Sequence, residues 1–288
     1  MSAIQALVMG IVQGLTEFVP VSSSAHLVLV PWLLAWPAPD PTFALGFDTV
    51  LHLGTLGALL AVFWRDLGQL ASAWLASLRR APAVQAVGEG LPSGTDASGA
   101  AHATLAWALI VGTIPAVLVG VAVDDWIEGL FNSPGWVAAL LIATGLLLLA
   151  SERWGRSERS LGSVGARLGL VIGLAQAVAI APGISRSGAT ISAGRFVGLP
   201  RAEAARFSFL LATPAVAGAG ILQVARLAGA GLLAQNAGLL LLGFLSALVS
   251  GYLIIRFLLS YLQRHSLRPF AAYCLLAGGL CLAAWLLR

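Results

Sequence analysis

Long apolar segments, separated by short polar stretches, occupy most of the 288 residues of the chain. The uninterrupted segments approach or exceed the roughly 18 apolar residues that are typical of a membrane-spanning helix. The pattern therefore predicts an all-α integral membrane protein. The six predicted transmembrane helices cover about residues 47–64, 103–123, 136–150, 203–225, 238–259 and 270–287.

Two further apolar stretches, residues 1–35 and 168–199, are interrupted by polar groups. The first contains Gln13, Glu17 and a run of three serines, and the second is broken by the sequence Ala-Pro-Gly-Ile-Ser-Arg-Ser-Gly-Ala-Thr at residues 181–190. Non-helical backbone at membrane depth is tolerated only where protein or a water-filled cavity surrounds it. Each stretch therefore predicts two helices joined by a polar turn, which together form a re-entrant helical hairpin.

The basic residues, all of them arginines, collect in alternate loops. Arg65 and Asp66 are expected to end the first span, and the Gly-, Ser- and Pro-rich residues 88–101 to form a loop. Cytoplasmic loops of membrane proteins carry an excess of basic residues. By this rule the first hairpin enters the membrane from outside and the second from the cytoplasm. Loops near 65–80, 151–167 and 261–268 are predicted to be cytoplasmic, and loops near 36–46, 124–135 and 227–237 to be external.

The two hairpins share a spacing that indicates an inverted repeat. Gln13 precedes the serines at 22–24 by nine residues, and Gln176 precedes Ser-Arg-Ser at 185–187 by the same nine. Inverted-topology repeats place a polar site near the bilayer midplane, where broken helices of the two halves meet. We therefore predict one polytopic membrane domain, residues 1–288, with half-repeats of about 1–150 and 166–288.

The composition excludes a soluble globular protein. Hydrophobic residues make up 59% of the chain and charged residues 10%, whereas soluble domains carry about 25% charged residues. The net charge of +4 comes from arginines beside apolar segments, so we expect no nucleic-acid partner. Cys274 and Cys281 lie in one apolar segment and form no zinc or disulfide pattern.

The second hairpin carries groups that suit a cluster of anionic oxygens. Arg186 offers five N–H donors in a fixed arrangement, and Ser185, Ser187 and Thr190 add hydroxyl donors. Charge-assisted hydrogen bonds of this kind bind phosphate strongly. The alternative is a polar loop whose arginine extends to the membrane surface.

The first hairpin carries groups that suit acid–base and nucleophilic chemistry. Gln13 and Glu17 are four residues apart and share a helix face. A carboxylate in an apolar environment needs a compensating cation, for which a metal ion or Arg186 is available. An unperturbed histidine has a pKa near neutrality, so His26 suits proton transfer, although an isolated histidine is also a common structural residue. Ser22, Ser23 and Ser24 add hydroxyl groups.

Together, the hairpins fit the cleavage of a phosphoric anhydride. Arg186 and the hydroxyls would hold the phosphates, a divalent ion on Glu17 would offset their charge, and a serine or an activated water would attack. A transporter or lipid flippase built on the same inverted repeat is the alternative function. Asp48 and His52, four residues apart, either line the cavity or pack near the membrane interface.

Two motifs carry a resemblance to a known family. They read Gln-Gly-Leu-Thr-Glu-Phe-Val-Pro-Val-Ser-Ser-Ser-Ala-His at residues 13–26 and Ala-Pro-Gly-Ile-Ser-Arg-Ser-Gly-Ala-Thr at residues 181–190. The pair resembles the bacterial undecaprenyl-diphosphatase family, also called the bacitracin-resistance family. The similarity covers nearly the whole chain, including residues 47–55 and 207–215.

This resemblance implies a multi-pass enzyme of the bacterial plasma (inner) membrane. Its activity would be removal of one phosphate from undecaprenyl diphosphate, which regenerates the lipid carrier for peptidoglycan synthesis. It also implies an active site open to the periplasmic or outer face and a divalent cation, Mg or Ca, as cofactor. The polyprenyl substrate and membrane lipid are the expected partners. Whether the protein forms a homodimer is left open by the sequence.

The resemblance also implies roles for individual residues. Glu17 becomes the essential carboxylate and metal ligand, Ser23 the candidate nucleophile, and His26 the acid–base group or a competing nucleophile. Arg186 joins them as the fourth catalytic candidate. The family often has glutamate where this chain has Gln13, so a metal site with two carboxylates is in doubt. The candidate substrate-binding residues are Gln13, Ser22, Ser24, Ser185, Ser187 and Thr190.

Overall fold

The computed structural model describes residues 1–37, 39–79, 94–122, 133–229 and 236–288. All the regular structure in these ranges is helical, as the apolar pattern predicts. The helices are α1 (Ala3–Phe18), α2 (Ser23–Leu33), α3 (Pro41–Arg79), α4 (Gly94–Ala122), α6 (Pro134–Trp154), α7 (Ala166–Val178), α8 (Arg186–Phe196), α9 (Arg201–Gly229), α11 (Ala237–Tyr261) and α12 (Arg268–Leu287), with a short 3-10 helix at Leu161–Ser163.

Several of these helices are long and apolar enough to cross a membrane. By length and hydropathy, α3, α4, α6, α11 and α12 qualify within the described residues. Helix α9 covers the remaining predicted span with 29 residues. The structure thus confirms an all-α, multi-pass membrane protein, while the arrangement of six spans and two re-entrant hairpins stays a prediction.

The sequence predicts that the first membrane span ends at Arg65 and Asp66, and α3 itself continues past them to residue 79. Both charged side chains have partners within the protein. The Arg65 guanidinium lies 5.0 Å from the centre of the Trp64 ring, and Asp66 pairs with Arg206 of α9. At about 1.5 Å per residue, a helix of 39 residues exceeds the ~30 Å hydrocarbon core, so one end of α3 extends beyond it.

The predicted loop at residues 88–101 is wrong in its second part, because α4 already begins at Gly94. Its first part lies outside the described residues. Most of the predicted external loops at 124–135 and 227–237 also lie outside them.

The two interrupted stretches form pairs of short helices, as predicted. Helices α1 and α2 are joined by residues 19–22, and α7 and α8 by residues 179–185. A serine caps the second helix of each pair: Ser22 Oγ accepts a hydrogen bond from the backbone N–H of Ala25 at 3.3 Å, and Ser185 Oγ accepts one from Gly188 at 3.0 Å. Such caps satisfy backbone donors at a helix start, so each polar run begins a new helix.

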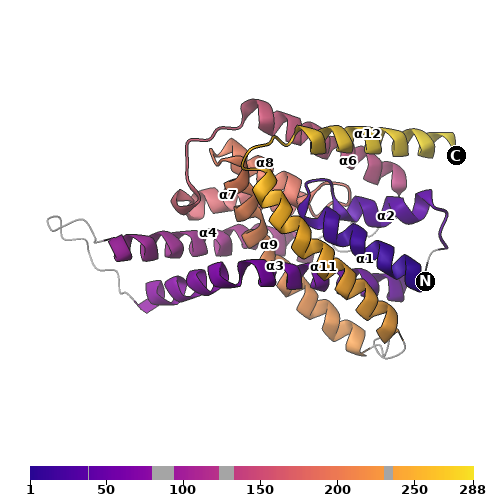
Figure 1. Ribbon diagram of the computed structural model, residues 1–288, viewed down its shortest axis with the longest axis horizontal. Coiled ribbons are helices and arrows are strands. Elements are labelled where there is room, and N and C mark those ends of the chain that lie inside the picture. The colour runs from indigo at the N-terminus through magenta and orange to yellow at the C-terminus, as the bar shows by residue number, and fades with distance from the viewer. Residues whose placement is uncertain (38, 80–93, 123–132, 230–235) are drawn as a thin grey trace.

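The first helix of each hairpin packs closely on a long helix of the other half of the chain. Helix α1 lies along α11, and α7 lies along α4 (Figure 1). A Cβ atom on Gly10 of α1 would lie 2.6 Å from the carbonyl oxygen of Gly243, and one on Gly173 of α7 would lie 2.6 Å from Cα of Gly112. Small residues at these crossings allow the backbones to approach closely, as is common between membrane helices.

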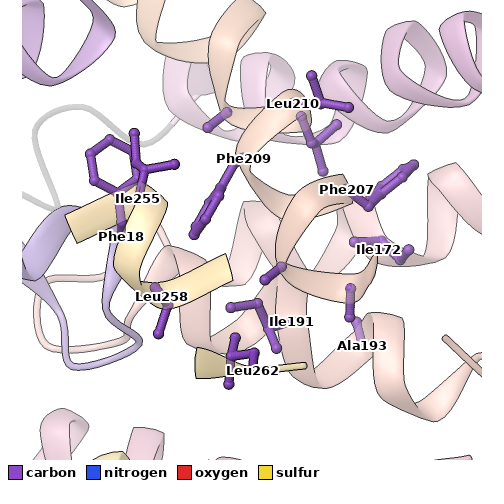
Figure 2. Close-up of a cluster of buried hydrophobic side chains, with 14 of the residues drawn as sticks. Phe18, Ile172, Ile191, Ala193, Phe207, Phe209, Leu210, Ile255, Leu258 and Leu262 are labelled. Atoms are coloured by element: carbon purple, nitrogen blue, oxygen red, sulfur yellow. The ribbon is translucent and has the colours of Figure 1, made fainter. Parts of the chain in front are cut away.

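A buried apolar cluster lies behind both hairpins (Figure 2). It combines Phe18 of α1, Ile172 of α7, Ile191 of α8, Phe209 of α9 and Ile255 of α11. The rings of Phe18 and Phe209 meet edge to face with their centroids 5.4 Å apart. The cluster therefore fixes the short helices against the long ones and sets the position of their polar tips.

Substitution of glycine by alanine should have opposite effects on stability at Gly173, which lies at a helix crossing, and at Gly279, which does not. In Gly173→Ala, the added methyl group would clash with the Gly112 backbone, and overpacking of this kind costs roughly 1–3 kcal/mol. In Gly279→Ala the methyl group would enter open space within α12, and alanine favours a helix interior. The thermal midpoint in detergent should fall for the first variant and stay or rise for the second. Equal midpoints would contradict tight packing of α7 on α4.

Candidate active site

The tips of the two hairpins touch. The Ser187 hydroxyl donates to the Val19 carbonyl at 3.3 Å, and the Gly183 N–H donates to Ser24 Oγ at 3.3 Å. Gly183 has φ +106°, in the region where a side chain is strained. Polar groups that are far apart in the sequence therefore meet between the tips.

The carboxylate of Glu17 is the centre of this meeting point. Arg186 Nη2 donates to Glu17 Oε1 at 3.0 Å. Ser23 Oγ donates to Oε2 at 2.6 Å, and Gln13 Nε2 donates to the same oxygen at 3.0 Å. The structure thus confirms that Gln13 and Glu17 share a face and that Arg186 is the cation beside Glu17.

Glu17 and Arg186 are buried, so each charge requires the other as its partner. The Glu17 side chain is 6% exposed and that of Arg186 18% exposed. Loss of one partner would leave an uncompensated buried charge, which is strongly unfavourable. Two buried atoms of the site have no hydrogen-bond partner in the described protein: Arg186 Nη1 and Gln13 Oε1. Since buried polar atoms are rarely left unpaired, these atoms are available to a ligand.

The turn before α2 is strained. Ser22 has φ 68° and ψ 98°, a conformation that costs a non-glycine residue about 1–3 kcal/mol. Its hydroxyl lies 3.1 Å from Ser24 Oγ. In the second hairpin Ser185 Oγ lies 3.1 Å from Ser187 Oγ. Both candidate hydroxyl pairs therefore flank the tips in matching positions.

His26 lies close to the tip but makes no hydrogen bond to Ser23. Its Nδ1 lies 2.7 Å from the Ser22 carbonyl oxygen and its Nε2 lies 2.7 Å from Tyr273 Oη. Since a carbonyl only accepts, Nδ1 carries a proton, and in the neutral ring Nε2 accepts from the tyrosine. Tyr273 is 247 residues away along the chain, and nothing in the sequence pointed to it.

Thr190 is not at the meeting point. Its hydroxyl donates to the Arg186 carbonyl at 2.8 Å and lies 2.6 Å from Ser208 Oγ. The residue is fully buried between α8 and α9. Its contacts therefore support the helix that carries Arg186, with no group directed at the tips.

Thr144 of α6 holds the second tip and was missed by sequence reasoning. Its hydroxyl donates to the Gly183 carbonyl at 3.1 Å and accepts from the Ser185 N–H at 3.0 Å. A lone threonine in an apolar span gives no signal of such a role, because the pattern does not say which residue faces the hairpin.

His52 resolves an alternative that the sequence left open. Its Nε2 lies 3.8 Å from Glu17 Oε2, so this residue borders the candidate site. The backbone carbonyl of Asp48 accepts a hydrogen bond from His52 Nδ1 at 2.7 Å.

The other arginines near this region serve the scaffold. Arg195 donates to the backbone carbonyls of residues 155, 156 and 199. Arg201 forms a two-pronged pair with Glu152, with both N–O distances 2.7 Å. These contacts tie α6, α8 and α9 together and leave Arg186 as the arginine at Glu17.

The site offers few protein ligands for a divalent ion. No group of three or more His, Cys, Asp or Glu side chains that could hold a metal occurs in the described residues. Glu17 and the unpaired amide oxygen of Gln13 offer oxygen ligands. Such sparse protein ligation fits Mg²⁺, which is commonly held by one or two carboxylates together with substrate phosphates and water.

The chain matches known proteins over nearly its full length. The family model described as Bacitracin resistance protein BacA matches residues 6–280. A protein of Thermomicrobium roseum named undecaprenyl-diphosphatase is 47% identical over 285 residues, 96% of each chain. Proteins of the same name from Geobacter sulfurreducens and Desulforudis audaxviator are 46% and 44% identical, covering 98% and 100% of each chain. This chain belongs to the bacitracin resistance protein BacA family.

Proposed function

We propose that this protein hydrolyses undecaprenyl diphosphate to undecaprenyl phosphate and inorganic phosphate, and so recycles the lipid carrier for peptidoglycan synthesis. The names of its relatives support this activity. One observation carries it: Ser23 and Arg186, from different hairpins, meet on the two oxygens of Glu17. A nucleophile, its proton acceptor and a phosphate-binding cation are thereby assembled.

Arg186 is the proposed phosphate anchor. Its Nη2 is held by Glu17, and its buried Nη1 has no partner in the described protein. A guanidinium fixed on one side presents its remaining N–H groups in a defined direction. A diphosphate oxygen is the kind of acceptor that satisfies Nη1. The hydroxyls of Ser22, Ser24, Ser185 and Ser187 lie at the two tips and would serve as further donors.

Ser23 is the proposed nucleophile, with Glu17 as its base. The Ser23 proton passes to Glu17 Oε2, Oγ bonds to the terminal phosphorus, and the bridging P–O bond breaks to release undecaprenyl phosphate. Glu17 then returns its proton to Oγ as the bond from Oγ to phosphorus breaks. Water forms the new P–O bond and gives up one proton, and inorganic phosphate leaves. Direct attack by water held at Glu17 is the competing route.

His26 has a supporting place in this scheme. Both its ring nitrogens are engaged, one by Ser22 and one by Tyr273. We assign it to holding the strained turn that presents Ser23. A proton-transfer role would require Tyr273 to release Nε2 or to relay the proton.

A divalent cation fits this site as a partner of the substrate. Glu17 and Gln13 would contribute oxygens, and the phosphates and water would supply the rest. When bound, such an ion would offset the negative charge of the diphosphate. A carrier needs the phosphate anchor alone, so the Ser23–Glu17 contact favours the enzyme over the flippase.

The proposed membrane arrangement has six spans and two re-entrant hairpins related by an inverted repeat. Matching serine caps, matching hydroxyl pairs and the paired crossings of α1 on α11 and α7 on α4 support it. The arginine-rich loops support an active site that opens to the periplasmic face of the bacterial inner membrane. The half-repeats would be about 1–150 and 166–288.

The activity is tested by phosphate release from undecaprenyl diphosphate in detergent. We expect purified protein to release phosphate, to stop when a chelator is added and to recover with Mg²⁺ or Ca²⁺. Glu17→Gln should lower kcat/KM by about 10³-fold or more, because Arg186 loses its counter-charge and Ser23 its base. Glu158→Gln, at an exposed carboxylate paired with Arg156, is the control and should retain activity. No release by the unaltered protein would overturn the proposal.

The route of attack is tested by Ser23→Ala. Covalent attack predicts a loss of about 10³-fold or more, because no other hydroxyl contacts Glu17 in the described structure. Ser72→Ala, which removes an exposed hydroxyl bonded within its own helix, should leave activity unchanged. A loss below about tenfold at residue 23 would instead support direct attack by water.

The orientation is tested by single added cysteines and an impermeant thiol reagent on intact cells. The native cysteines, Cys274 and Cys281, are buried and give little background. Thr42→Cys, at the exposed start of α3, should be labelled from outside. Ser160→Cys, in the exposed loop after α6, should react only after permeabilisation. The reverse pattern would contradict the proposed orientation.

A further inference from the structure

His52 faces the same carboxylate oxygen as the proposed nucleophile. Its Nε2 lies 3.8 Å from Glu17 Oε2, and Ser23 Oγ donates to that oxygen at 2.6 Å. Gln13 Nε2 also donates to Oε2 at 3.0 Å, so both lone pairs of this oxygen are already engaged. At 3.8 Å the imidazole is beyond hydrogen-bond distance. Its Nε2 therefore lies beside Glu17 without a hydrogen bond to it.

The imidazole is held in a defined orientation. Nδ1 donates to the Asp48 carbonyl one turn earlier in α3, at 2.7 Å, which directs Nε2 towards Glu17. Two residues later in α3, the backbone packs closely on α11 at Gly54, where an added Cβ would lie 2.5 Å from the Phe244 carbonyl oxygen. The contact between α3 and α11 thus sets where His52 stands relative to the hairpins.

Exposure increases from Glu17 to His52. The side chains of Glu17, Arg186 and His52 are 6%, 18% and 37% exposed. A ligand that approaches Glu17 therefore encounters the imidazole on the accessible side and the guanidinium at greater depth. His52 Nε2 and Arg186 Nη1 are two nitrogen atoms at Glu17 without a hydrogen bond in the described residues.

We propose that His52 is a substrate-binding residue whose Nε2 contacts the phosphoryl group that Ser23 attacks. The inference rests on the proposed phosphatase function and extends its site to a residue of α3. Since Ser23 Oγ and His52 Nε2 both lie near Glu17 Oε2, a phosphorus within reach of Ser23 Oγ brings its oxygens near Nε2. The contact does not depend on the protonation state of the ring, because Nε2 donates to a phosphate oxygen or accepts from a protonated one. Arg186 then holds the other side of the diphosphate.

The test measures binding separately from turnover. The probe is a prenyl methylenediphosphonate, whose bridging carbon prevents hydrolysis, titrated into purified protein in detergent. His52→Ala should weaken its binding about tenfold or more, and His52→Gln should weaken it less, because the amide reaches the position of Nε2. His265→Ala is the matched control: this exposed histidine makes the same bond to the carbonyl four residues earlier, and its loss should change nothing.

A double variant shows whether His52 contacts the probe directly or acts through Glu17. In Glu17→Gln protein, added His52→Ala should still weaken binding of the probe by a similar factor. Disappearance of the effect in this background, or unchanged binding in the single variants, would overturn the proposal. Thermal midpoints and the milder His52→Gln variant identify misfolding. Phosphate release by the unaltered protein reports on the phosphatase function independently.

Discussion

A buried ion pair between Glu17 and Arg186 is the constraint on which the rest of this structure depends. Charged side chains inside apolar segments are costly unless they find a partner, and these two lie 169 residues apart in the sequence. They meet because the polar turns of the two helix pairs pack against each other. The pair is a weak source of stability, since desolvation offsets most of its attraction. Its value lies in fixing a carboxylate and a guanidinium around one small space.

The two hairpins use the same local construction for different chemistry. Ser22 and Ser185 each cap a helix, and the residue that follows each cap contacts Glu17. In the first hairpin this residue is Ser23, and in the second it is Arg186. Equivalent positions thus deliver the proposed nucleophile to one carboxylate oxygen and the phosphate anchor to the other. The same serine-capped turn, present in both hairpins, thus presents two residues with different proposed roles to Glu17.

Residues outside the two tips hold the site in place. Tyr273 of α12 and the Ser22 carbonyl fix the ring of His26, while Thr144 of α6 fixes the second tip. The positive φ of Ser22 shows that the surrounding contacts impose a conformation the turn would not adopt alone. Such preorganisation is valuable for phosphoryl transfer, where catalysis depends mainly on positioning and electrostatic stabilisation.

The sequence by itself determined the helical class, the two interruptions and the need of Glu17 for a cation, with Arg186 as one candidate. Apolar length and polar breaks report where a segment can lie in a membrane, and a buried charge demands an opposite one. The sequence did not show that α3 continues past Asp66, where this residue pairs with Arg206 of α9. Only the tertiary structure decided which face of each long helix turns towards the hairpins, and so brought His52, Thr144 and Tyr273 to the site. The physical reason is that spans apolar on all sides carry no periodic signal of their rotation or neighbours, and small residues at the crossings set both.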